Sequence, residues 1–352
     1  MLRPALLSLA LLTALAGCSK TEPPKKEPFA AVSAALTDAV LLPAYTRWTD
    51  SDRQLADSAR AFCSGEQALS QARQAFLAAH GAWAALQPLA IGPLGEGKLS
   101  RQVHSGQPDA LARQIDTLLD SKPLPKQADL EGAAPEVQGL SAYEYLLFDP
   151  SRNLADLEQM RRYCPLLLAI GSHQQALSAK VLAAWMGEQG LARNLKNFPN
   201  ARYAEGRAAV AELLRAEVSA LDGFKGQLGG LLGRDAAPTP QPLAAVSGSL
   251  LSGLDAGLAS AETLWRGQNN DGLRSLLGKD QADLVTRLDG AFAETRQRLA
   301  ALGRPLGELL ADPAGQASLN QLYDSLDSLA RLHGNDLAQA LGVPSGSTRT
   351  VN

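Results

Sequence analysis

The chain is poor in β-branched apolar residues, and this limits what it can fold into. Among 352 residues there are three isoleucines and eleven valines, although 45% of all residues are hydrophobic. A sheet built without β-branched residues packs poorly, so a sheet-rich fold is disfavoured. Leucine and alanine carry the apolar content instead, and both lose little side-chain freedom in a helix. The sequence therefore predicts an all-α fold.

Apolar residues recur with helical spacing along most of the chain, and clusters of glycine and proline separate the periodic segments. The simplest architecture is two helical-bundle domains that meet near residue 200. We therefore expect one bundle over residues 29–200, a second over 201–342, and a polar tail over 343–352.

The N-terminus has the pattern of a processed leader. An apolar run of about a dozen residues follows Arg3, which is too short to span a bilayer and is typical of a signal peptide over residues 1–17. The run ends in Leu-Ala-Gly-Cys, which resembles a lipobox and predicts lipidation of Cys18. Ser19 stands where an inner-membrane lipoprotein carries aspartate, so we expect a protein held on the outer membrane and facing the periplasm. A chance match after an ordinary signal peptide is the alternative. The polar, proline-rich residues 18–28 are interpreted as a tether.

The cysteine count then predicts a disulfide. Once Cys18 is set aside, the remaining cysteines are Cys63 and Cys164, an even pair in an oxidising compartment. We expect them to be bonded to each other, and two buried free thiols are the alternative.

Charge and motifs exclude several function classes. The net charge is −3, from 33 basic and 36 acidic residues, so no cationic surface for nucleic acid is expected. It also provides no broad acidic surface for cations, so any metal site must be local. The chain has no nucleophile elbow, phosphate-binding loop, dinucleotide fingerprint or haem-attachment motif.

Residues 139–148 are the segment best suited to a functional site. Glu144 is a lone carboxylate in an apolar helical run, and at a spacing of three it shares a helix face with Ser141. Burying a carboxylate is costly unless the group is paired or functional. A glutamate that points to solvent, or that pairs with an arginine, is the alternative.

Several short motifs follow the lipobox along the chain. They are Trp83 to Pro88, Ile91-Gly92-Pro93, Gly139 to Phe148, Tyr163-Cys164 with Ala169-Ile170, and Leu341 to Val343. Their order resembles the imelysin family. The resemblance covers most of residues 29–343, and its most specific part is residues 139–148. It implies a two-domain all-helical fold in periplasmic or surface proteins associated with bacterial iron acquisition.

That family is described by a Gly-x-His-x-x-Glu motif, proposed as a metal-binding or functional element. Here the glycine is Gly139 and the glutamate is Glu144, but Ser141 stands at the histidine position. A serine hydroxyl is a poor ligand for transition metals, so the metal proposal transfers weakly. The family's early assignment to metallopeptidases transfers less, because no His-Glu-x-x-His set occurs. We therefore expect a protein that is not an enzyme.

The other candidate residues are ranked below Glu144, Ser141 and Gly139. Arg101 and Asp109 are second-tier site residues, because they lie in or beside the loop that precedes the motif. His104 and His173 are weak candidates to join Glu144 as metal ligands. His80 and His333 are expected to be packed, structural histidines.

These features together predict a lipoprotein of iron uptake that binds an iron species or another ligand near Glu144. The cofactor is left open, with iron as the candidate, and the partners expected are the membrane and other iron-uptake proteins. A protein-interaction scaffold without a metal is the alternative, which the missing histidine favours, and a peptidase is a less favoured third.

Overall fold

The computed structural model describes residues 27–96, 98–104, 108–120, 126, 130–234, 244 and 246–344. Within these ranges every regular element is a helix, and turns and loops connect the helices. The predicted all-α fold is confirmed. The signal peptide, Cys18 and most of the tether lie outside the described residues, as does the tail beyond residue 344.

The helices differ widely in length. The α-helices are α1 (Pro28–Leu36), α2 (Leu42–Cys63), α3 (Leu69–Leu86), α4 (Lys98–Val103), α5 (Pro108–Asp120), α7 (Leu140–Phe148), α8 (Leu157–Met186), α9 (Leu191–Asn194), α10 (Gly206–Leu231), α11 (Leu250–Arg266), α12 (Ala282–Ala301), α13 (Leu306–Ala311), α14 (Pro313–Arg331) and α15 (Ala338–Leu341). A π-helical turn, Thr37–Leu41, joins α1 to α2, and another, Leu332–Leu337, joins α14 to α15.

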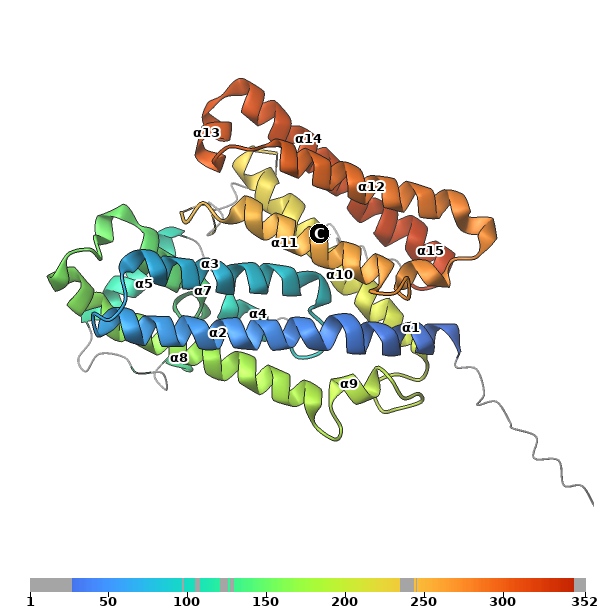
Figure 1. The fold of residues 1–352 in the computed structure, drawn as a ribbon, viewed down its shortest axis with the longest axis horizontal. Coiled ribbons are helices and arrows are strands. Elements are labelled where there is room, and N and C mark those ends of the chain that lie inside the picture. The colour runs from blue at the N-terminus through green and yellow to red at the C-terminus, as the bar shows by residue number, and fades with distance from the viewer. Residues whose placement is uncertain are drawn as a thin grey trace, which may run out of the picture.

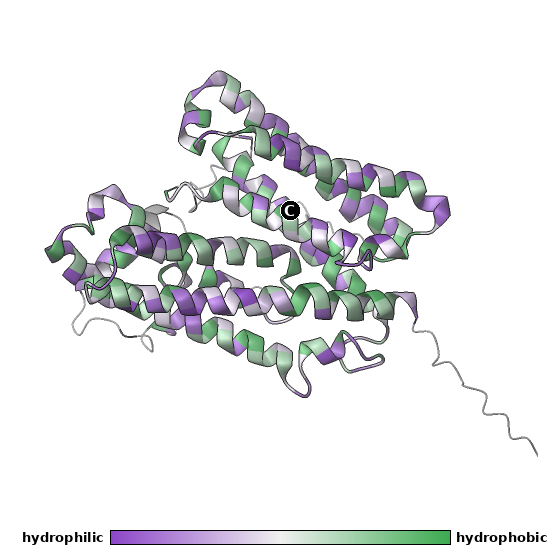
Figure 2. Ribbon diagram, in the orientation of Figure 1, coloured by the Kyte–Doolittle hydropathy of each residue, from purple (hydrophilic) through white to green (hydrophobic). Residues whose placement is uncertain are grey.

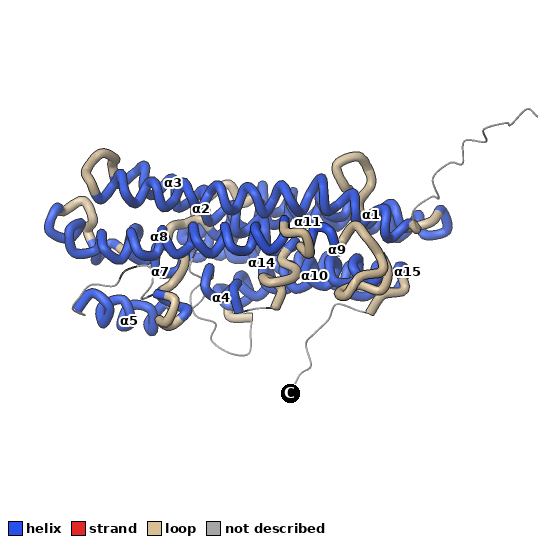
Figure 3. The backbone as a smooth tube through the Cα atoms, turned by 90° about the horizontal axis from the view of Figure 1, so that it is seen from below, coloured by secondary structure: helices blue, strands red, loops and turns tan. Residues whose placement is uncertain are grey.

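The long helices form two groups that share one interface (Figure 1), and the view from below shows α2, α3 and α8 of the first group running along one another (Figure 3). In the first group α2 packs against α3 and α8, and in the second α14 packs against α10 and α12. Helices α10 and α11 lie between the outer helices of the two groups (Figure 1). Helix α11 packs on α3, and α10 packs on α1 and on the turn Gln87–Leu89 that follows α3. Residues far apart in the sequence therefore meet where α3 faces α10 and α11.

The apolar core runs through both groups. Polar and apolar residues mix along the helices, as expected for amphipathic helices that bury one face (Figure 2). The buried apolar residues belong to a single cluster, which includes Trp48 and Trp185 of the first group and Trp265 of the second. The predicted division into residues 29–200 and 201–342 stays a prediction.

The first helical stretch is unusually apolar. Residues Pro28–Cys63 are long and apolar enough to cross a membrane by length and composition, and half of the most apolar window is buried in the fold. A core helix passes the same test, and the contacts of α1 with α10 and of α2 with α3 and α8 account for the apolar faces.

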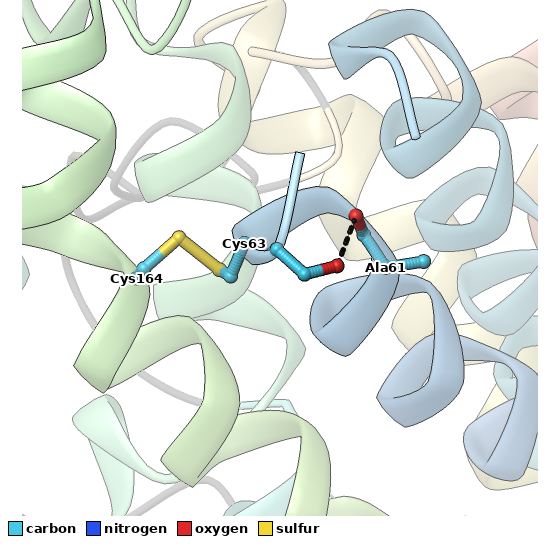
Figure 4. Close-up of a disulfide and its surroundings, with 4 residues drawn as sticks. Ala61, Cys63 and Cys164 are labelled. Atoms are coloured by element: carbon cyan, nitrogen blue, oxygen red, sulfur yellow. Dashed lines mark hydrogen bonds between the residues drawn. A yellow bond between two sulfur atoms is a disulfide. The ribbon is translucent and has the colours of Figure 1, made fainter. Parts of the chain in front are cut away.

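The predicted disulfide is confirmed. Cys63 is the last residue of α2 and Cys164 lies in α8, with their Cα atoms 5.7 Å apart and their sulfurs bonded (Figure 4). The two residues are 101 positions apart in the sequence. The bond therefore holds the C-terminal end of α2 to the helix that follows α7.

Candidate functional site

Glu144 lies inside the protein, at the contact between the two helix groups. It belongs to α7, which packs on α3 and α8, and only 1% of its surface is exposed. Its Oε1 accepts a hydrogen bond of 2.9 Å from the backbone N–H of Ser247, in the turn just before α11. A solvent-facing Glu144 or one paired with an arginine, the alternatives left open by the sequence, is not what the structure shows.

Ser247 begins a short row of hydrogen-bonded side chains. Its hydroxyl lies 2.7 Å from that of Ser249, whose Oγ lies 3.3 Å from Nδ1 of His80 in α3. The imidazole of His80 in turn lies against that of His104, with ring centroids 6.4 Å apart. Glu144, Ser247, Ser249, His80 and His104 are called the Glu144 row below. The row connects α7 and α3 of the first group with the start of α11 in the second.

Burial sets the protonation states along the row. It raises the pKa of Glu144 from 4.5 to about 7, and the hydrogen bonds from Ser247 oppose that rise. It lowers the pKa of His80 to about 3, with a further decrease from His104, and that of His104 to about 4. Both imidazoles are therefore neutral near neutral pH, while Glu144 is close to its titration midpoint.

The motif glycine has a steric explanation. Gly139 is the N-cap of α7, and a Cβ atom there would lie 2.2 Å from the carbonyl oxygen of Val103 and 2.4 Å from that of Gln102. The end of α4 thus approaches the start of α7 so closely that no side chain fits. Ser141 is fully buried on the same helix.

A cavity of about 690 Å³ lies beside the row, between the segment that follows α3 and helix α10. His104 belongs to both the row and the cavity wall, whereas Glu144 is not a lining residue. The cavity wall also includes charged and apolar side chains, namely those of Trp83, Leu94, Glu96, Arg101, Arg202, Glu212, Arg215 and Ala216.

One side of the cavity wall is a closed ion-pair network. Arg202 contacts Glu212 at 2.8 Å and Glu96 at 3.5 Å, and the Tyr203 hydroxyl donates to Glu212 at 2.7 Å. The backbone N–H of Gly92 also donates to Glu212, at 3.1 Å. Burial alone would raise the pKa of Glu212, but these hydrogen bonds hold it below its usual value. Both oxygens of the Glu212 carboxylate therefore have protein partners.

Within the described residues, the candidate metal ligands Glu144, His104 and His173 do not belong to a three-donor group. Across the described residues there is no group of three or more His, Cys, Asp or Glu side chains that could hold a metal ion. His104 is connected to Glu144 only through the other members of the row. His173 lies on α8, and its buried Nε2 has no hydrogen-bond partner among the described residues. The side chains that the structure describes therefore do not fit a directly bound iron ion.

The remaining candidate residues lie in different parts of the structure. Arg101 lines the cavity, whereas Asp109 falls within α5 and its side chain lies outside the described residues. His333 is fully buried in the second group, with Nδ1 3.1 Å from Oε2 of Glu217, which fits its expected structural role. His80 is packed as expected, but it is also a member of the row.

Sequence reasoning did not find Ser247, Ser249 or Arg215. The two serines flank Gly248 just before a helix, a pattern that resembles an ordinary turn. Arg215 is one of many arginines on solvated helix faces. Only the packing of α11 against α3, and of α10 against the turn Gln87–Leu89, singles out these residues.

The described residues form an all-α fold in which the Glu144 row ends at a cavity between α10 and the segment that follows α3. Residues 41–333 match the model of the imelysin family, which is also named as peptidase family M75. Because that match covers most of the chain, the protein belongs to the imelysin family.

Solved structures agree with this assignment. An imelysin-like protein from Psychrobacter arcticum superposes with a TM-score of 0.72 at 17% identity, covering 91% of this chain and 97% of the other. A protein from Parabacteroides distasonis, named as an iron-regulated protein A precursor, gives a TM-score of 0.75 at 14% identity with the same coverage. At these identities the likeness shows a shared fold. The search of curated proteins found no match.

Proposed function

We propose that this protein is an envelope lipoprotein of iron uptake that binds a ligand in the cavity between its two helix groups, with the Glu144 row forming one side of the site. The observation that carries the proposal is the burial of Glu144 in a row that reaches His104 on the cavity wall. The iron connection is supported by the family and by the name of the Parabacteroides relative.

The row would position the cavity wall rather than contact the ligand through Glu144. A ligand that moves His104 would disturb the contact with His80, and the hydrogen bonds of Ser249 and Ser247 would carry that change to α7. Both helix groups contribute to the row, so ligand binding would also favour one arrangement of the two groups.

Iron accumulation in cells tests the proposal. A strain of the native bacterium that lacks the gene should take up radioactive iron more slowly in iron-depleted medium, and the wild-type gene should restore the rate. Glu144→Ala, which removes the acceptor of the Ser247 hydrogen bond, should restore it incompletely, whereas Glu66→Ala, a change at an exposed turn residue, should restore it fully. Normal uptake in the deletion strain would refute a role in iron uptake.

The lipid anchor is part of the same proposal. Cys18 would carry the acyl groups, and Ser19 would direct the protein to the periplasmic side of the outer membrane. Labelling of cells with a tagged fatty acid should mark the protein, and Cys18→Ser should abolish the label. A wild-type protein that takes up no label would exclude the anchor.

A protein-interaction scaffold of the iron-uptake system is the second candidate. It is favoured by one observation: among the described side chains, no three His, Cys, Asp or Glu residues lie close enough together to hold a metal ion. Cross-linking in iron-starved cells should then capture a specific envelope protein, and capture should not depend on the cavity arginines.

We infer that the protein is not a peptidase, despite the family's name. The sequence contains no His-Glu-x-x-His, and the part of the chain that the structure describes offers no set of zinc ligands. Incubation with casein, with and without a chelator, tests this directly. Chelator-sensitive hydrolysis by the purified protein would overturn the inference.

A further inference from the structure

The cavity wall carries two arginines that the fold does not use. Arg101 comes from α4 and Arg215 from α10, so two different helices supply them. Both are exposed, and within the described residues neither forms an ion pair. Arg202, the third arginine of the wall, is by contrast held by Glu212 and Glu96. Positive charge at the cavity is therefore left without a protein counter-ion.

The wall also contains a buried polar atom without a partner. Nε2 of His104 is buried, and no hydrogen-bond partner for it exists in the described part of the chain. Burial keeps this imidazole neutral, so it can offer one N–H donor without adding charge. Leaving such a group unpaired is costly, and a shift of the His104 ring that brings Nε2 to an oxygen atom of a ligand in the cavity would remove that cost.

Apolar side chains complete the cavity. Trp83, Leu94 and Ala216 line it together with the two arginines. An inorganic anion would pair with the two arginines but leave the apolar side chains exposed to water, whereas the carbon skeleton of an organic anion would bury them. Guanidinium groups bind carboxylates through paired hydrogen bonds, which suits a ligand with more than one carboxylate.

From this wall we infer that the cavity binds a small organic polycarboxylate, free or as a metal chelate, through Arg101 and Arg215. The inference deepens the proposed ligand-binding function, on which it rests. It also accounts for a link to iron without a metal site among the described residues, because the carboxylates of a chelator can supply the metal ligands that those residues do not bring together.

Calorimetric titration of the full-length protein in mild detergent tests the inference, with citrate and ferric citrate as probes and the neutral ferric maltol complex as the comparison. Arg101→Gln and Arg215→Gln should each weaken citrate binding roughly ten- to hundredfold, the range expected for a charge-assisted hydrogen bond. Arg47→Gln should leave it unchanged, because Arg47 is an exposed α2 arginine outside this cavity. Arg101→Lys should recover only part of the loss, since lysine keeps the charge but not the paired geometry.

The outcomes are distinct. Binding of citrate with and without iron identifies a free polycarboxylate site, and binding of ferric citrate alone identifies a chelate site; both support the inference if the two arginine variants weaken binding. The inference is overturned if neither probe binds at millimolar concentration, if the arginine variants bind like wild type, or if ferric maltol binds equally well. None of these results decides iron uptake, which the uptake of radioactive iron by the deletion strain tests separately.

Discussion

The buried carboxylate of Glu144 makes the stability of the protein depend on pH in a defined direction. Burial raises its pKa from 4.5 to about 7, so the folded protein holds this proton more tightly than the unfolded chain does. Stability is therefore unaffected below about pH 4.5, falls as the pH rises toward 7, and is lowest above that, where the group is ionised in both states. A difference of one in pKa between the folded and unfolded states is worth about 1.4 kcal/mol. The rise of the Glu144 pKa from 4.5 to about 7 therefore lowers the free energy of unfolding above pH 7 by about 3 kcal/mol.

Glu144→Gln isolates this effect. Glutamine keeps an Oε1 atom that can accept the hydrogen bond from Ser247, but it carries no charge at any pH. Urea unfolding, followed by circular dichroism, should show the stability of the variant relative to wild type increasing by about 3 kcal/mol between pH 4.5 and pH 8. The other titrating groups are common to both proteins and cancel in the difference.

Glu66→Gln is the matched control, because Glu66 is exposed in the turn after α2. Its stability relative to wild type should stay nearly constant over the same pH range. If the Glu144→Gln difference were equally flat, the carboxylate would titrate alike in the folded and unfolded states, and the burial argument for the row would be wrong.

Three further changes should alter stability. Gly139→Ala should destabilise the protein by about 1–3 kcal/mol in thermal unfolding, because the added Cβ would overlap backbone carbonyl oxygens, whereas Gly132→Ala, with open space around it, should change it little. Joint replacement of Cys63 and Cys164 by alanine should lower the unfolding free energy by about 2–5 kcal/mol, and an unchanged urea midpoint would contradict that. His80→Gln should reduce the loss of stability that wild type shows below about pH 6.5. The pKa of His80 is about 3 in the folded state, so on acidification the imidazole of the unfolded chain is protonated first, and this favours unfolding. Acid-unfolding curves of the same shape for the variant and wild type would contradict this.

Some of the site could be predicted from local sequence. Glu144 is identified by the sequence as a single charged residue in an apolar helical run, and Gly139 is identified as the glycine at which that run begins. Both are buried, Glu144 at the contact between the two helix groups and Gly139 against the end of α4. His80 and Arg215 carry no such local signal, because a histidine in a helix is usually packed and an arginine on a helix face is usually solvated. Their importance depends on Ser249 and on the cavity, both of which involve distant parts of the chain.

The sequence by itself determined the helical class and the cysteine pairing. The shortage of isoleucine and valine is a property of composition, and it disfavours sheets whatever the chain topology. The pairing of Cys63 with Cys164 follows from parity once Cys18 is set aside, and it needs no knowledge of the fold. Tertiary structure alone decided which residues meet at the site. The contact of Glu144 with Ser247 spans 103 positions, and that of His80 with Ser249 spans 169, so both depend on α11 packing against α3. Helical periodicity specifies which face of a helix is buried, but it does not specify the partner helix or the register in which the two pack.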